Sequence, residues 1–149
     1  MTIKAIKWFD GTDHDFLSNF HPGSVLLDGF EYPTVEHAYQ AAKCADSSDR
    51  TPFKLARSPG LAKRMGQSVK LRGDWEGVKT EVMHGLVRQK FMRHPHLTKM
   101  LLATGDSHLE EGNDWNDRVW GTVDGVGENR LGVILMRVRH EIRASQVAA

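Results

Sequence analysis

The sequence predicts an α+β fold, organised as a single, mainly helical domain over residues 1–149 with a small β component. Three observations support this prediction. Apolar residues recur at spacings of three and four in several stretches, which is typical of helices that bury one face. An Asp-Gly pair separates two short apolar runs, which favours one tight hairpin. The length of 149 residues suits one domain, and no internal repeat or linker divides it.

The β component is expected near the N-terminus. Residues 3–9 carry enough apolar side chains for a first strand, and residues 25–27 and 30–32 flank the pair Asp28-Gly29. Asp-Gly suits a type I′ turn, because both central residues of that turn need positive φ. We therefore expect a short hairpin around this pair.

The first helix is expected to begin after Thr34, a residue type that caps helix N-termini. Its apolar stripe is Val35, Ala38, Tyr39 and Ala42. Two short helices are expected next, over residues 52–56 and 59–65, with Gly66 as the C-cap of the second.

The longest helix is expected to begin at Asp74 and to stop at His94-Pro95, because proline breaks a helix interior. A short helix over residues 97–103 should follow, and then a long polar loop over residues 109–127 with one or two short strands. The last helix should begin near Leu131. Its apolar stripe is Leu131, Ile134, Leu135, Val138 and Ile142.

Composition excludes several classes of protein. Basic and acidic residues number 20 and 19, so the formal net charge is only +1 and a histone-like binder is excluded. No apolar run reaches the roughly 18 to 20 residues that span a bilayer, and the N-terminus has no signal-peptide pattern. The single cysteine, Cys44, allows neither an internal disulfide nor a cysteine zinc site. We therefore expect a cytoplasmic protein in a reducing setting.

One helical face carries residues suited to chemistry. Glu36, Gln40 and Lys43 project from nearly the same side of the helix after Thr34, because their spacing of four and then three follows the helical period. The face therefore presents a carboxylate, an amide and an amine beside an apolar stripe. On spacing alone, a solvated polar face with Glu36 as a favourable first-turn acid is the stronger interpretation.

The loop over residues 109–132 is the second unusual stretch. It gathers Asn, Asp and Gly residues around Trp115 and Trp120, and long irregular loops are often functional. Tryptophans in a polar loop are able to stack on a planar base. The same residues also suit ordinary turns and a lid over a small core, so the pattern leaves both interpretations open.

Other motifs point to no cofactor or metal. Gly125-x-Gly127 lacks the third glycine of a dinucleotide fingerprint, because Arg130 stands in its place. The eight histidines show no metal-ligand spacing. Cys44 is expected to be a small buried residue rather than a nucleophile. We expect neither a cofactor nor a metal site.

The chain resembles the NADAR, or YbiA-like, family through a set of motifs in the family's order. The motifs are FLSNF (16–20), YPTVEHAYQAAK (32–43), RGDWEGVK (72–79), Met83, KF (90–91), LLATG (101–105), NDRVWG (116–121) and GENRLGVILMRVR (127–139). Each motif alone is weak, whereas the ordered set spans nearly the whole chain and is highly specific. Two departures are Cys44, where relatives often carry an aromatic residue, and Thr122-Val123, where they often have a Gly-containing pair.

The resemblance implies the mainly helical fold of that family and an enzyme that hydrolyses N-glycosidic bonds. Two substrate classes are attached to the family. One is ADP-ribose linked to guanine in DNA or RNA, where the enzyme reverses the modification made by a toxin. The other comprises early phosphoribosylamino-pyrimidine intermediates of riboflavin synthesis. Both contain an amine nitrogen on C1 of a 5-phosphorylated ribose.

The resemblance also implies functional residues. Glu36 matches the active-site glutamate, Lys43 matches the lysine that ends the helix motif, and Asp117 matches a further pocket position. We predict these three as catalytic. The predicted substrate-binding residues are Asn19, Arg72, Trp75, Trp120 and Asn129.

Two mechanisms remain open. Glu36 and Asp117 are able to share acid and base roles around a water. Alternatively, the ribose opens to an imine and Lys43 forms a Schiff base with it, once burial lowers its pKa. A different class of function is a non-catalytic module that binds ADP-ribose or NAD. The Glu36 carboxylate argues against this alternative, because it would repel an anionic ligand.

Overall fold

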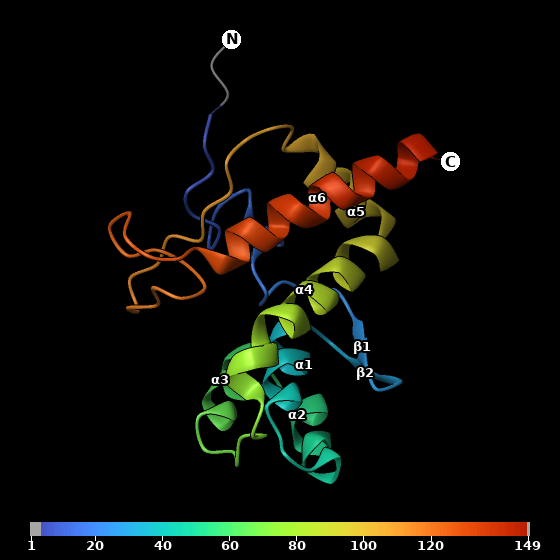
Figure 1. Ribbon diagram of the computed structural model, residues 1–149, viewed down its shortest axis with the longest axis vertical. Coiled ribbons are helices and arrows are strands. Elements are labelled where there is room, and N and C mark those ends of the chain that lie inside the picture. The colour runs from blue at the N-terminus through green and yellow to red at the C-terminus, as the bar shows by residue number, and fades with distance from the viewer. Residues whose placement is uncertain (1–3, 149) are drawn as a thin grey trace. The chain divides into compact units, whose positions relative to one another are not determined.

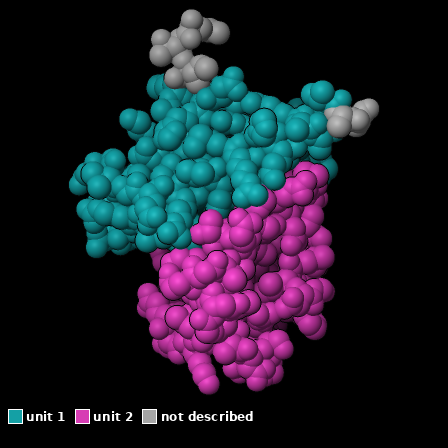
Figure 2. All heavy atoms as spheres, in the orientation of Figure 1, with its two compact units in different colours: residues 1–18, 94–149 teal, residues 19–93 magenta. Residues whose placement is uncertain are grey.

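The computed structural model describes residues 4–148 and divides the chain into two compact units (Figure 2). Unit 2 spans Asn19–Arg93. Unit 1 combines the segment that ends at Ser18 with the chain from His94 onward. No helix within residues 4–148 is both long and apolar enough to cross a membrane.

Unit 2 contains the predicted hairpin. Strand β1 (Val25–Leu27) pairs antiparallel with β2 (Phe30–Tyr32), and the turn residues Asp28 and Gly29 have φ of 51° and 83°. Positive φ at both positions confirms the expected type I′ turn. The side chain of Gln89 accepts from the Leu26 N–H at 2.7 Å and donates to the Leu26 carbonyl at 2.8 Å. The side-chain amide of Gln89 thus bonds the outward backbone groups of β1, to which a third strand would otherwise pair.

Helix α1 (Val35–Ala42) contacts each of its neighbours in unit 2 (Figure 1). These are β1, β2, α2 (Thr51–Leu55), α3 (Pro59–Gly66), α4 (Trp75–Arg93) and the 3-10 turn η2 (Ser47–Arg50), which precedes α2. Thr34 caps α1 as predicted, since its side chain accepts from the His37 N–H at 3.1 Å. All eight residues of α1 are buried.

The end of α3 differs from the prediction. Gly66 is the last helical residue, and the C-cap is Gln67, with φ −72° and ψ −19°. The chain therefore stays right-handed beyond Gly66, so the left-handed glycine that usually ends a helix is not needed there. The presence of glycine at position 66 requires another explanation.

Helix α4 begins directly after Asp74 and ends at Arg93, as predicted. His94 is extended, with φ −122° and ψ 96°, because Pro95 disfavours helical backbone in the residue before it. Pro95 then opens α5 (Pro95–Ala103), where its missing N–H costs no helical hydrogen bond.

Unit 1 is built on α5, α6 (Arg130–Ala148) and the 3-10 turn η1 (Asp15–Leu17), and α5 contacts both of the others (Figure 1). The predicted last helix is confirmed. Every member of its predicted apolar stripe is buried: Leu131, Ile134, Leu135, Val138 and Ile142.

The predicted first strand is wrong within the described residues, and Ile3 lies outside them. Ile6 forms only an isolated parallel bridge with Leu109. One further backbone bond joins the two segments, from the Gly112 N–H to the Lys7 carbonyl at 3.1 Å, but the Glu111 carbonyl accepts within the loop from the Thr122 N–H at 2.9 Å, so no regular ladder forms. The loop likewise forms isolated bridges, Gly112 with Thr122 and Val123 with Val126, instead of the expected short strands.

We predict that Leu135→Ala lowers the free energy of unfolding by about 2–5 kcal/mol, because it leaves a cavity beneath α6. Leu135 is 0% exposed, whereas Val133 on the same helix is 54% exposed. Val133→Ala should change stability by less than about 0.5 kcal/mol. Urea unfolding of both variants measures the difference, and equal losses would contradict the assigned core face.

Candidate functional site

Glu36 is a buried carboxylate with a defined hydrogen-bond donor. It lies in the first turn of α1 and is 7% exposed. Gln40, one turn along the helix and 4% exposed, donates from Nε2 to Glu36 Oε1 at 2.8 Å. The interpretation of this face as solvated is therefore wrong for Glu36 and Gln40. A buried carboxylate with one oxygen held in place is suited to interact with positive charge that develops nearby.

Lys43 ends the same helix and is partly buried. Burial lowers the pKa of its amine from the ordinary lysine value, and the neighbouring charges of Lys79 and Lys63 lower it further. The negative charge of Glu36 opposes this shift. The Lys43 Nζ lies 5.6 Å from the ring centroid of Tyr39. A lysine whose neutral form is favoured in this way is suited to act as a nucleophile.

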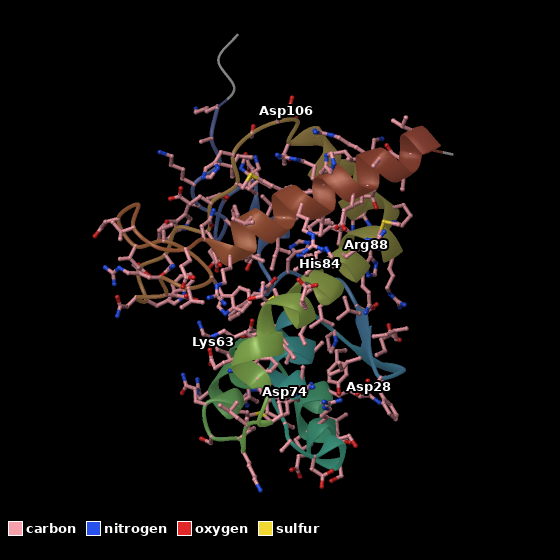
Figure 3. The ribbon with its side chains drawn as sticks, viewed as in Figure 1. Asp28, Lys63, Asp74, His84, Arg88 and Asp106 are labelled. Atoms are coloured by element: carbon pink, nitrogen blue, oxygen red, sulfur yellow. The ribbon has the colours of Figure 1, made fainter. Side chains whose placement is uncertain are left out.

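Lys63 and Lys79 are charged neighbours of Lys43 that are not among the predicted site residues. Lys63 lies on α3 and Lys79 on α4, where its Nζ bonds Glu76 Oε2 at 2.7 Å (Figure 3 labels Lys63). Neither lysine is close to Lys43 in sequence. The contacts that α1 makes with α3 and α4 bring them near Lys43, so spacing along the sequence does not predict this proximity.

Arg72 and Trp75 flank the start of α4. The Arg72 Nε and Nη2 bond the two carboxylate oxygens of Asp74 at 2.6 and 3.0 Å, and this pairing raises the pKa of Arg72 (Figure 3 labels Asp74). Trp75 is 4% exposed and its ring centroid lies 5.2 Å from that of Tyr39. Both residues are therefore engaged within unit 2, and their predicted contacts with substrate stay predictions.

Asn19 supports the first turn of α1. Its carbonyl accepts from the Glu36 N–H at 3.2 Å, and its Nδ2 donates to the Met83 sulfur at 3.4 Å. Asn19 thus helps to fix the backbone of the residue that carries the carboxylate. Its predicted contact with substrate also stays a prediction.

Asp117 and Trp120 lie in the long loop of unit 1. The Asp117 Oδ1 accepts from the backbone N–H groups of Val119 and Trp120 at 3.0 and 2.9 Å. Asn113, which is buried, closes the other side of the turn, accepting from the Asp117 N–H at 3.0 Å and donating to the Asp117 carbonyl at 2.8 Å. One carboxylate oxygen of Asp117 therefore organises the turn that presents Trp120.

Asn129 joins three parts of the same loop. It has φ of 51° and is 7% exposed, its Oδ1 accepts from the Glu111 N–H at 3.0 Å, and its Nδ2 donates to the Leu109 carbonyl at 3.0 Å. Its carbonyl accepts from the Val133 N–H at 3.0 Å at the start of α6. The side chain is therefore used to hold the loop, an assignment that the sequence alone did not provide.

The predicted site residues divide between the two units. Unit 2 brings together five of them: Asn19, Glu36, Lys43, Arg72 and Trp75. Unit 1 holds the other three: Asp117, Trp120 and Asn129. The carboxylate pair of Glu36 and Asp117 thus stays a prediction.

Other groups contribute less to the site. Among residues 4–148, no group of three or more His, Cys, Asp or Glu side chains is arranged to hold a metal ion. Cys44 is buried, and burial raises the pKa of its thiol, which disfavours the reactive thiolate. A cavity of about 510 Å³ in unit 1 is lined in part by Lys4, Lys7 and Trp8, and contains none of the predicted site residues.

Comparison with known proteins gives a consistent result. The NADAR domain model matches residues 8–143. The N-glycosidase YbiA of Escherichia coli (strain K12) is 41% identical over 133 residues, which cover 87% of this chain and 82% of that protein. The riboflavin biosynthesis protein VVA0006 of Vibrio vulnificus is 40% identical over 134 residues, covering 88% of this chain and 36% of that longer protein.

A solved structure is similar over the whole chain. The NMR structure of the E. coli protein YbiA superposes with a TM-score of 0.89 at 37% sequence identity, and covers 100% of this chain and 90% of that one. The expected α+β class, with six α-helices and a two-stranded sheet among the described residues, is therefore confirmed. The chain belongs to the NADAR family.

Proposed function

We propose that this chain is an N-glycosidase that hydrolyses the bond between C1 of a 5-phosphorylated ribose and an amine nitrogen of a base. The observation that carries the proposal is the buried Glu36 carboxylate on the same helix as Lys43, whose pKa is lowered by burial. The activity class agrees with the names of the relatives, N-glycosidase and riboflavin biosynthesis protein. We place the reaction in the cytoplasm, which the single cysteine favours.

The carboxylate has a specific task in this reaction. Breaking a ribosyl C–N bond develops positive charge at C1 and at the ring oxygen. Glu36 stabilises that charge more strongly than it stabilises the neutral ground state, which lowers the barrier instead of merely tightening binding. A binding module would gain nothing from such a group.

Lys43 provides a route through a covalent intermediate. The ribose ring opens to an imine between C1 and the amine of the base, and neutral Lys43 Nζ adds to C1. The base amine then takes a proton and leaves, so that C1 and Nζ form an iminium. Water adds to C1, the C1–Nζ bond breaks, and the aldehyde sugar and free lysine are released. The net consumption is one water, as in direct hydrolysis.

The remaining predicted residues are proposed to bind substrate. Trp75 and Trp120 would contact the base or the sugar face, and Asn19 and Asn129 the hydroxyls. Arg72 suits the 5-phosphate because guanidinium groups bind phosphate through paired hydrogen bonds. Asp117 is proposed as a second carboxylate that positions water, alongside its hydrogen bonds to the Val119 and Trp120 amides.

Substrate choice lies between the two classes that share the phosphoribosylamine unit. Mass spectrometry after incubation with an oligonucleotide that carries ADP-ribosyl-guanine tests the first, and the phosphoribosylamino-pyrimidines test the second. Release of ADP-ribose would identify reversal of a guanine modification, with a toxin as the partner activity. Release of ribose 5-phosphate from the pyrimidines alone would identify clearance of metabolites. A tight complex without turnover of either substrate would favour the binding module.

We predict that Glu36→Gln lowers kcat by about 10²–10⁴-fold, because the neutral amide no longer stabilises positive charge at C1. Circular dichroism should show an unchanged fold. The matched control is Glu31→Gln, which alters an exposed carboxylate on β2 and should leave turnover unchanged. Near-normal turnover by folded Glu36→Gln would exclude Glu36 as a catalytic residue.

We predict that cyanoborohydride traps a covalent adduct between substrate and Lys43, since it reduces the iminium to a stable secondary amine. Peptide mass mapping should locate the added ribose phosphate on Lys43. Lys43→Ala should form no adduct, whereas Lys70→Ala, which alters an exposed lysine, should trap normally. An active Lys43→Ala variant would leave the direct water route.

The yield of trapped adduct should rise with pH, because only the neutral amine attacks. Burial lowers the pKa of Lys43, so the midpoint of the rise should lie below the ordinary lysine value of about 10.4. Adduct measured at a fixed short time across a pH series gives the midpoint. A midpoint at the ordinary lysine value would contradict the proposed activation by burial.

A further inference from the structure

We propose that Gln40 is a positioning residue for the Glu36 carboxylate, and that residue 66 is a glycine because the Gln40 amide occupies the space of its Cβ. The inference rests on the proposed function, since it assigns how the carboxylate of that reaction is held. It concerns α1 and α3 alone, which contact each other within unit 2.

The hydrogen bond between the two side chains fixes the orientation of the Gln40 amide. Nε2 donates to Glu36 Oε1 at 2.8 Å, and the opposite orientation would place an amide oxygen against a carboxylate oxygen. Oε1 must therefore point away from Glu36. Among the described residues it is buried and has no hydrogen-bond partner.

An unpaired buried acceptor is uncommon and calls for an explanation. Leu or Met would fill a similar volume on α1 without burying an unpaired oxygen. The presence of an amide at this position is explained by its Nε2 group, which donates to the Glu36 carboxylate. The sequence thus keeps a group that is unfavourable for packing and useful for the orientation of Glu36.

Gly66 stands directly behind the amide. A Cβ built on Gly66 would overlap Gln40 Oε1 and lie 2.7 Å from Cδ. Gly66 is helical and has no positive φ, so its backbone would accept any residue, and alanine would favour the helix. Close approach, not backbone conformation, is therefore what requires glycine here.

Together these contacts form a wedge, defined by Gly66, Gln40 and Glu36. The backbone of α3 blocks the Gln40 amide from swinging away from Glu36, and the amide holds one carboxylate oxygen in place. Gln40 contributes no atom to the reaction. It acts by keeping the carboxylate in the orientation that stabilises charge at C1.

The steric half of the inference is tested by stability. Gly66→Ala should lower Tm by roughly 3–10 °C, despite the better helix propensity of alanine. The matched control is Gly60→Ala on the same helix, because a Cβ there meets only Ser58 Oγ at 3.9 Å and Tm should not fall. In a Gln40→Ala background, Gly66→Ala should lose most of its effect, since the overlapping atoms are gone.

The positioning half is tested by kinetics. Gln40→Met removes the donor at similar size, and should lower kcat about 10- to 100-fold, the factor expected for one hydrogen bond to a charged group. KM should change less than about threefold, because other groups bind the substrate. Gln40→Ala serves as a second variant if Gln40→Met folds poorly.

The pH dependence of activity in Gln40→Glu distinguishes a positioning role from a purely structural one. Two adjacent carboxyl groups share one proton at low pH, and the protonated Glu at position 40 is then able to donate to Glu36 as the amide does. Its activity should therefore approach that of the unaltered protein at acidic pH and fall as pH rises. Gln40→Met should stay low throughout.

Crystal structures separate failure of this inference from failure of the proposed function. In Gln40→Met the Glu36 carboxylate should adopt more than one orientation, while in Gly60→Ala it should keep one. An inactive unaltered protein would overturn the proposed function only. An unchanged Glu36 in Gln40→Met, unaltered kcat in that variant, or equal Tm for Gly66→Ala and Gly60→Ala would each overturn the inference.

Discussion

The burial of α1 on all sides is the constraint on which unit 2 depends. A helix of eight buried residues that includes Glu36, His37 and Gln40 must supply partners for their polar atoms. His37 Nε2 donates to the Ala56 carbonyl at 3.0 Å, and Nδ1 lies 2.8 Å from the Thr34 hydroxyl, which also caps the helix. Glu36 is bonded by Gln40, and Gln40 needs Gly66 behind it. The polar partners of α1 therefore come from its own cap, its own side chains and its neighbours in space, although the Gln40 Oε1 has none among the described residues.

Local patterns were sufficient for most of the fold. The Thr34 cap, the Asp28-Gly29 turn and the stop at Pro95 each act within a few residues, and the structure confirms all three. The first strand failed because its pairing depends on a distant loop segment, which forms only an isolated bridge with it at Ile6. Spacing placed Glu36 and Lys43 on one helical face, and the family resemblance predicted them as catalytic. Neither identified the wedge at Gly66, because only the contact between α1 and α3 creates it.

The loop of unit 1 shows why its residues were harder to interpret. Asn113, Asp117 and Asn129 bond backbone groups of the loop, which is what Asn and Asp do in any long irregular segment. The same groups are the ones that bind hydroxyls and water in a site. Sequence alone therefore does not separate the two roles. The structure adds that Asn129 already uses both its amide oxygen and its amide nitrogen, whereas the side-chain hydrogen bonds of Asp117 involve Oδ1 and not Oδ2.

The electrostatics around Glu36 and Lys43 fit a reaction in which positive charge develops from a neutral amine. Burial favours the neutral amine of Lys43, whereas the charge of Glu36 favours its ammonium form. In the proposed covalent route the neutral amine attacks C1, and a positive charge appears at the same nitrogen only when the iminium forms. Glu36 thus faces more positive charge after the attack than before it, and little reorganisation is needed around a carboxylate that Gln40 already holds. An arrangement that merely bound an anionic sugar phosphate would be weakened by the same carboxylate.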